Sequence, residues 1–98
     1  MNDDIAPSDG NPYVDLRSAV AYRLMRELKR RLGSSKAISD ALSRGDARVY
    51  GVWNAIDREA LRQRVAALPA ERANPGNIGL IAFDGVVDAF RQVGWTDA

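Results

Sequence analysis

Apolar residues recur at every fourth position in the first long segment of the chain. The repeat runs through Leu16, Val20, Leu24, Leu28 and Leu32. Gly33 comes directly after it, and glycine is the residue most often found just past the end of a helix. This spacing predicts a helix from about Asp15 to Leu32.

The two sides of this first helix differ in chemistry. On a helical wheel the apolar positions, with Met25 among them, fill one arc. The opposite arc carries Arg23, Arg26, Lys29 and Arg30. The pattern therefore predicts one face for the core and one cationic face.

A second and a third helix are expected shortly after the first. Ser34 and Ser35 can cap a short helix of about eight to ten residues, in which Ala37, Ile38, Ala41 and Leu42 keep the helical spacing. The run Ser43-Arg44-Gly45-Asp46 is typical of a turn, and Asp46 can cap the next helix. The next apolar positions are Val49, Val52, Trp53 and Ile56. A third helix is expected to start near Ala47.

The hydrophobic pattern changes phase after the third helix. This change predicts a break between Asn54 and Asp57, and then a fourth helix from about Asp57 to Leu68 that Pro69 stops. Residues 69–77 are expected to form a loop. Residues 78–95 leave two alternatives open: a helix, which we favour, or a strand that enters a β-hairpin turn at Asp84-Gly85.

These elements predict an all-α fold, a small bundle of four to five helices that contains a helix-turn-helix unit. Residues 1–13 are expected to be a flexible acidic tail, and residues 14–98 a single domain. The side chains expected to be buried together are Val20, Leu24, Leu28, Ile38, Leu42, Val49, Val52 and Trp53.

Composition argues against an enzyme. The chain contains no histidine and no cysteine, so the commonest general base, the commonest metal ligand and all thiolate chemistry are missing. The acidic residues are scattered along the sequence. We therefore expect no catalytic residues, no bound metal and no cofactor.

Charge and hydropathy indicate where the protein works and what it contacts. The net charge is only +1, yet residues 17–48 hold nine basic and three acidic residues. Nothing in the sequence resembles a membrane span, and the acidic start Met-Asn-Asp-Asp does not resemble a signal peptide. We expect a cytoplasmic protein that does not enter membranes and whose middle third attracts anions.

A short helix, a tight turn and a helix with the stripe Val-x-x-Val-Trp together resemble a helix-turn-helix unit. From Gly33 to Asn54 the chain is similar to the small phage Cro and CII regulators. Ile38, Leu42, Val49 and Val52 stand where that motif packs its two helices together. The family usually has glycine where this chain has Ser43 and an apolar residue where it has Arg44, while Gly45 offers another way to make the turn.

The resemblance implies that the third helix enters the major groove of DNA. Arg48 would then pair with a guanine edge and Asn54 with adenine. The resemblance assigns DNA contact to Ser34, Ser35, Lys36, Arg44, Ala47, Arg48, Tyr50, Gly51 and Asn54. The row Arg23, Arg26, Lys29 and Arg30 would contact phosphates or an acidic partner, although such a row is also typical of an ordinary solvated helix face.

Two functions therefore stay open. The first is a sequence-specific DNA-binding transcriptional regulator of phage or bacterial type that acts as a homodimer. The alternative is a small protein-binding inhibitor or adaptor, for example a phage-encoded antagonist of a host complex, which uses the cationic helix face against an acidic protein surface.

Overall fold

A computed structural model describes residues 15–95, and every regular element in that range is helical. The all-α prediction is confirmed. The elements are α1 (Leu16–Leu32), α2 (Ser35–Ser43), α3 (Ala47–Ala55), α4 (Arg58–Ala66), a 3-10 turn (Ala70–Arg72) and α5 (Pro75–Gln92). The expected N-terminal tail, residues 1–13, lies outside the described residues.

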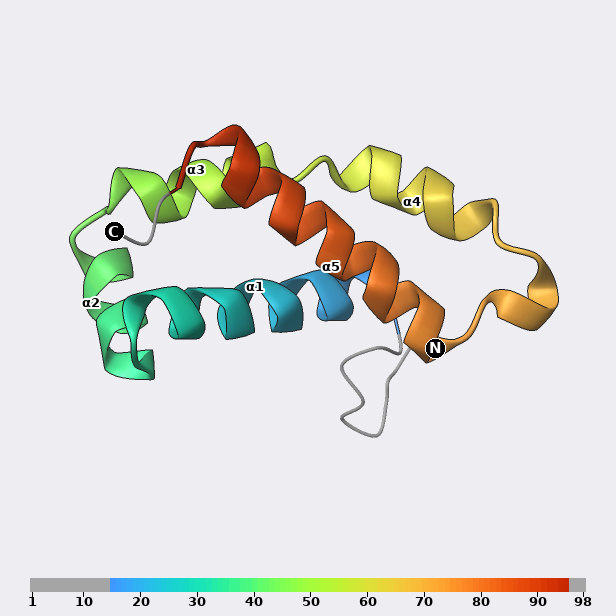
Figure 1. The fold of residues 1–98 in the computed structure, drawn as a ribbon, viewed down its shortest axis with the longest axis horizontal. Coiled ribbons are helices and arrows are strands. Elements are labelled where there is room, and N and C mark those ends of the chain that lie inside the picture. Colours follow the sequence, from blue (N-terminus) through green and yellow to red (C-terminus); the bar gives the residue numbers. More distant parts are fainter. Residues whose placement is uncertain (1–14, 96–98) are drawn as a thin grey trace.

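The two long helices α1 and α5 form the main packing pair of the fold. Figure 1 shows α5 crossing over α1, with α3 along one edge of the molecule, α1 along the opposite edge and α2 joining them at one end. α5 also contacts α3 and α4. Sections of the chain that are distant in sequence therefore meet along α5.

Local capping explains where the first helices begin and end. The Asp15 carboxylate accepts a hydrogen bond from the Ser18 backbone N–H at 2.7 Å and starts α1. Gly33 adopts the left-handed conformation, with φ of 102°, and its N–H bonds to the Lys29 carbonyl. Ser34 then caps α2 by accepting a bond from the Ala37 N–H. The predicted limits of α1 are confirmed.

A three-residue turn links α2 to α3. Gly45 adopts a left-handed conformation there, with φ of 67°, which glycine tolerates without steric strain. Asp46 accepts hydrogen bonds from the N–H groups of Arg48 and Val49, and so caps α3. Gly45 thus supplies the sharp bend that Ser43 does not.

The second half of the chain departs from the sequence expectations in two places. α4 ends at Ala66, two residues before the predicted Leu68. Residues 78–95 confirm the favoured alternative, a helix and not a β-hairpin, because α5 runs from Pro75 to Gln92 and includes most of them. It starts earlier than expected, since the Asn74 side chain caps the helix and Pro75 occupies the first position, where its missing N–H is not needed.

The core is aliphatic and lies between α1, α3 and α5. Six of the eight side chains expected inside are buried: Val20, Leu24, Leu28, Ile38, Val49 and Val52. The prediction is wrong for Leu42 and Trp53, which expose 40% and 45% of their surfaces. Phe90 on α5 takes the central aromatic position instead and is 2% exposed. Within residues 15–95, no helix combines the length and apolar character needed to cross a bilayer.

Candidate macromolecular interface

A cationic groove lies between α1 and α5 on the surface of the described residues. Its volume is about 750 Å³. The lining residues are Tyr22, Arg23, Arg26, Glu27, Lys29, Arg30, Gly33 and Phe83. Among the described residues, four cations and one carboxylate line this groove, a net charge of +3. The cationic row expected on the first helix is therefore gathered in one concave surface.

Aromatic rings hold two of these arginines in place. The Arg26 guanidinium donates a hydrogen bond to the Tyr22 hydroxyl at 3.1 Å and lies over the Tyr22 ring. The Arg23 guanidinium lies over the Phe83 ring, with Arg23 Cζ 5.5 Å from the ring centroid. Each Arg–aromatic pair keeps a positive charge at the groove with less side-chain freedom.

Glu27, the one carboxylate that lines the groove within residues 15–95, joins two arginines. Arg30 Nε donates to Glu27 Oε2 at 3.1 Å, and Arg31 Nε donates to the same oxygen at 3.2 Å. The hydrogen bond from Arg30 holds the pKa of Glu27 below its ordinary value, against the opposing effect of partial burial. Glu27 is therefore ionised at neutral pH and offsets part of the groove's positive charge.

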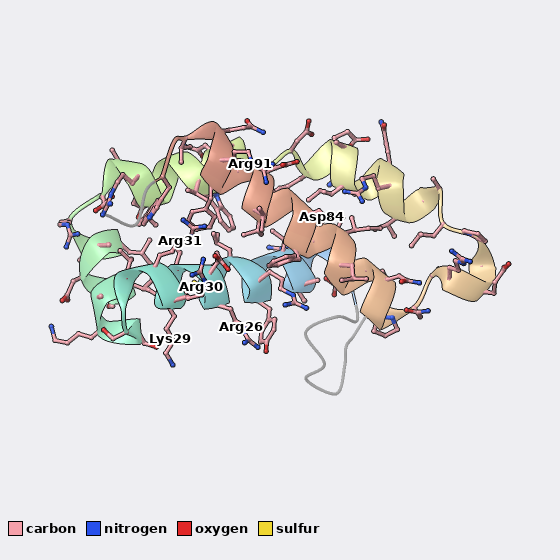
Figure 2. The ribbon with its side chains drawn as sticks, in the orientation of Figure 1. Arg26, Lys29, Arg30, Arg31, Asp84 and Arg91 are labelled. Atoms are coloured by element: carbon pink, nitrogen blue, oxygen red, sulfur yellow. The ribbon has the colours of Figure 1, made fainter. Side chains whose placement is uncertain are left out.

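The acidic residues of α5 do not add to this groove. Asp84 accepts a hydrogen bond from Arg64 of α4 at 3.3 Å, and Asp88 accepts one from Arg91 at 2.6 Å. Figure 2 shows Asp84 and Arg91 on α5 and the labelled cations along α1. In the part of the chain that the structure describes, the cations that line the groove all come from α1.

The residues expected to contact DNA around α2 and α3 carry less net charge. From Ser34 to Ala55 there are three cations and two acids, which gives +1. Lys36 pairs with Asp40 at 2.9 Å, and Arg44 pairs with Asp46 at 3.0 Å. Burial alone would raise the pKa of Asp46, but hydrogen bonds from the Val49 N–H and from Arg44 outweigh it and lower that pKa. Lys36 and Arg44, the two cations expected at phosphates in this segment, therefore each have a carboxylate beside them.

Some residues on the face of α3 that was expected to read DNA are exposed, and others contact neighbouring parts of the chain. Ala47 and Asn54 are exposed, as base contact would require. Gly51 instead faces α5, where an added Cβ would lie 3.6 Å from Val93. The Tyr50 hydroxyl points to α2 and donates to the Leu42 carbonyl at 3.4 Å. Arg48 lies over the ring of Trp95, which comes after α5.

The cationic row on α1 and the expected reading helix α3 belong to helices that lie along opposite edges of the molecule. Figure 2 shows Arg26 and Lys29 on the side of α1 that points away from α3. The fold measures 41 × 26 × 18 Å, so one straight duplex cannot pass along both sides at once. The row on α1 and the outward face of α3 are separate candidate surfaces.

A third surface, an apolar groove, was not foreseen from the sequence. It has a volume of about 260 Å³ between α1, α2 and α3. Its lining is entirely uncharged: Ala21, Leu24, Met25, Leu28, Leu42, Val49, Tyr50 and Trp53. Trp53 is partly exposed yet held in place, because the Arg58 guanidinium stacks on its ring with Cζ 4.3 Å from the centroid. Exposed apolar surfaces of this kind often mark contacts with other macromolecules.

Comparisons with protein-family models, with curated proteins and with solved structures find no match for this chain. The likeness to Cro and CII regulators therefore remains an expectation from the residues between Gly33 and Asn54. Among residues 15–95, no three carboxylates come together in a geometry that could hold a metal ion. The cationic groove, the outward face of α3 and the apolar groove are candidate interaction surfaces.

Proposed function

We propose that the protein is a small DNA-binding regulator and that the cationic groove of α1 and α5 holds the phosphate backbone. The observation that carries the proposal is the concentration of charge. The described lining of the groove gathers a net +3 in one concave surface, whereas the whole segment from Ser34 to Ala55 carries +1 and its Lys36 and Arg44 are paired with carboxylates. Phosphate contacts supply most of the sequence-independent affinity for nucleic acid, and that affinity rises with the number of cations that meet the backbone.

Within the groove, Lys29 and Arg26 are the main phosphate ligands in this proposal. Both side chains are exposed on the outer side of α1. Arg26 is oriented by its bond to Tyr22, which reduces the entropy lost when a phosphate binds. Arg30 is shared with Glu27 and contributes less.

Sequence reading by α3 is a second candidate function. It is favoured by the left-handed Gly45, which supports a tight turn between α2 and α3, and by the outward placement of Ala47 and Asn54. In this alternative Asn54 contacts a base edge, and Lys36 and Arg44 contact phosphates. The homodimer expected from the sequence would serve this alternative and stays a prediction.

A salt titration with matched variants tests the proposal. Arg26→Ala combined with Lys29→Ala removes two groove cations, and Lys36→Ala combined with Arg44→Ala removes two exposed cations near α3. Binding to labelled duplex DNA from a random pool is followed by fluorescence anisotropy. We expect the groove pair to lower affinity on every sequence and to reduce the slope of log K against log salt by about 2. The matched pair should leave both quantities near wild type.

The opposite result would assign DNA binding to α3. If only the Lys36 and Arg44 pair weakens binding, and Asn54→Ala relaxes the selected sequence, helix-turn-helix reading is supported and the groove proposal fails. If wild type binds no DNA but binds an acidic polyglutamate peptide through Arg26 and Lys29, the groove belongs to a protein partner, as in the adaptor or inhibitor alternative.

A further inference from the structure

We infer that the cationic groove takes a single-stranded nucleic acid, with an unpaired base against Phe83 and phosphates on Arg26 and Lys29. This inference rests on the proposed function and names the form of nucleic acid that the groove accepts. It depends on Phe83, which the sequence pattern assigned to no site. The crossing of α5 over α1 brings its ring beside the row of cations.

The aromatic component distinguishes this groove from a simple basic patch. Phe83 exposes 39% of its surface although it is a large apolar side chain, and it lines the groove together with Tyr22. The Arg23 guanidinium, which is itself planar, lies over the Phe83 ring. A cationic groove with partly exposed rings is the combination that binds single strands, because any base can stack on an aromatic face.

Duplex DNA cannot use the same rings. Its bases are stacked and paired inside the helix, so only its phosphates would meet α1. In a single strand the bases can turn toward Phe83 while successive phosphates contact Arg26 and Lys29. The length of the row fits a short stretch of strand, since Tyr22 to Lys29 spans about 10 Å of helix at about 1.5 Å per residue.

Equilibrium binding to three probes separates stacking from charge. The probes are a labelled oligothymidylate of about 12 nucleotides, within the usual site sizes for one binding domain, a duplex of the same length, and inorganic polyphosphate as a competitor without bases. The test variant is Phe83→Leu. Trp53→Leu is the matched control, because Trp53 is another partly exposed aromatic residue but lies in the apolar groove.

Wild type should bind the single strand more tightly than the duplex. Phe83→Leu should weaken single-strand binding roughly 5- to 100-fold, as expected for the loss of one base–aromatic contact, and leave polyphosphate competition unchanged. Phe83→Tyr, which keeps a ring, should retain most of the affinity. Trp53→Leu should behave as wild type, and unchanged far-UV circular dichroism checks that each variant is folded.

The inference and the proposed function fail in different ways. If Phe83→Leu binds the single strand as wild type does, or if duplex binds equally well, the single-strand inference is overturned while the groove remains a phosphate site. If Arg26→Ala combined with Lys29→Ala also leaves the affinity for nucleic acid unchanged, the proposed function fails together with the single-strand inference.

Discussion

The guanidinium of Arg48 lies over the indole ring of Trp95, with Arg48 Cζ 4.5 Å from the ring centroid. Trp95 in turn meets Phe90 edge to face, at a centroid distance of 5.2 Å. Arg48 therefore links the start of α3 to the segment after α5 and to an aromatic residue of the core. The side chain expected to read guanine has a structural partner.

This contact predicts that Arg48→Ala reduces the free energy of unfolding by more than it weakens the free energy of DNA binding. An exposed cation–π contact is worth about 0.5 to 1 kcal/mol. A double-mutant cycle with Trp95→Leu, measured by urea denaturation, should give a coupling energy of that size. A coupling near zero, together with a large loss of DNA affinity in Arg48→Ala, would show that Arg48 acts at α3 as a reading residue.

Gly85 is predicted to be required for the approach of α4 to α5. A Cβ added there would lie 2.6 Å from Leu61 Cδ1 and 3.2 Å from Leu61 Cγ, and Leu61 is buried. Alanine would gain about 1 kcal/mol of helix propensity, but overpacking costs about 1 to 3 kcal/mol. We expect Gly85→Ala to lower the free energy of unfolding by about 1 kcal/mol in chemical denaturation.

Gly51→Ala is the matched control for this prediction. The added Cβ would meet Val93 at 3.6 Å, an ordinary contact distance, within helix α3. The propensity gain should then dominate and raise stability by about 0.5 to 1 kcal/mol. Equal stabilisation by both substitutions would mean that α4 does not pack on α5 at Gly85.

Glu27→Gln should affect stability and binding in opposite directions. Because the folded-state pKa of Glu27 is lowered, its ionised form stabilises the fold above the unfolded pKa, and this contribution is lost as pH falls through the folded value. The variant should be less stable than wild type at neutral pH, and the difference should shrink below the ordinary glutamate pKa of 4.5.

The same substitution raises the net charge of the described groove lining from +3 to +4, because it removes the one carboxylate among those residues. Affinity for nucleic acid at low salt should therefore increase, and the increase should fade as salt is added. Thermal denaturation across pH and anisotropy across salt measure the two effects. A Glu27→Gln variant that binds more weakly than wild type would contradict the position of the groove.

Sequence patterns predicted the helices well because they depend on local spacing and caps. Gly33, Asp46 and the apolar repeat of α1 act within a few residues of their own positions. The start of α5 was missed because Asn74-Pro75-Gly76 suits either a turn or a capped helix. Tertiary packing favours the capped helix over the turn, because α5 buries Ile81, Val86 and Phe90 against its neighbours.

Exposure and site geometry were harder to predict, because they depend on which helices meet. The spacing of Trp53 placed it on the buried stripe of α3, but Trp53 lines the apolar groove and is 45% exposed. Phe83 could not be assigned to the cationic row from sequence, since only the crossing of α1 and α5 brings them together. The cations of the groove were predictable from the sequence, and its aromatic wall was not.

Nucleic-acid binding in the cationic groove is tested most directly by a nuclear magnetic resonance titration of ¹⁵N-labelled protein with single-stranded oligothymidylate. We predict that changes in backbone amide shifts cluster on α1 from Tyr22 to its end, at the following Gly33, and around Phe83 on α5. Residues of α3 from Ala47 to Ala55 should change little. Shifts confined to α2 and α3, with the groove residues unperturbed at saturation, would contradict the central claim that the cationic groove binds nucleic acid.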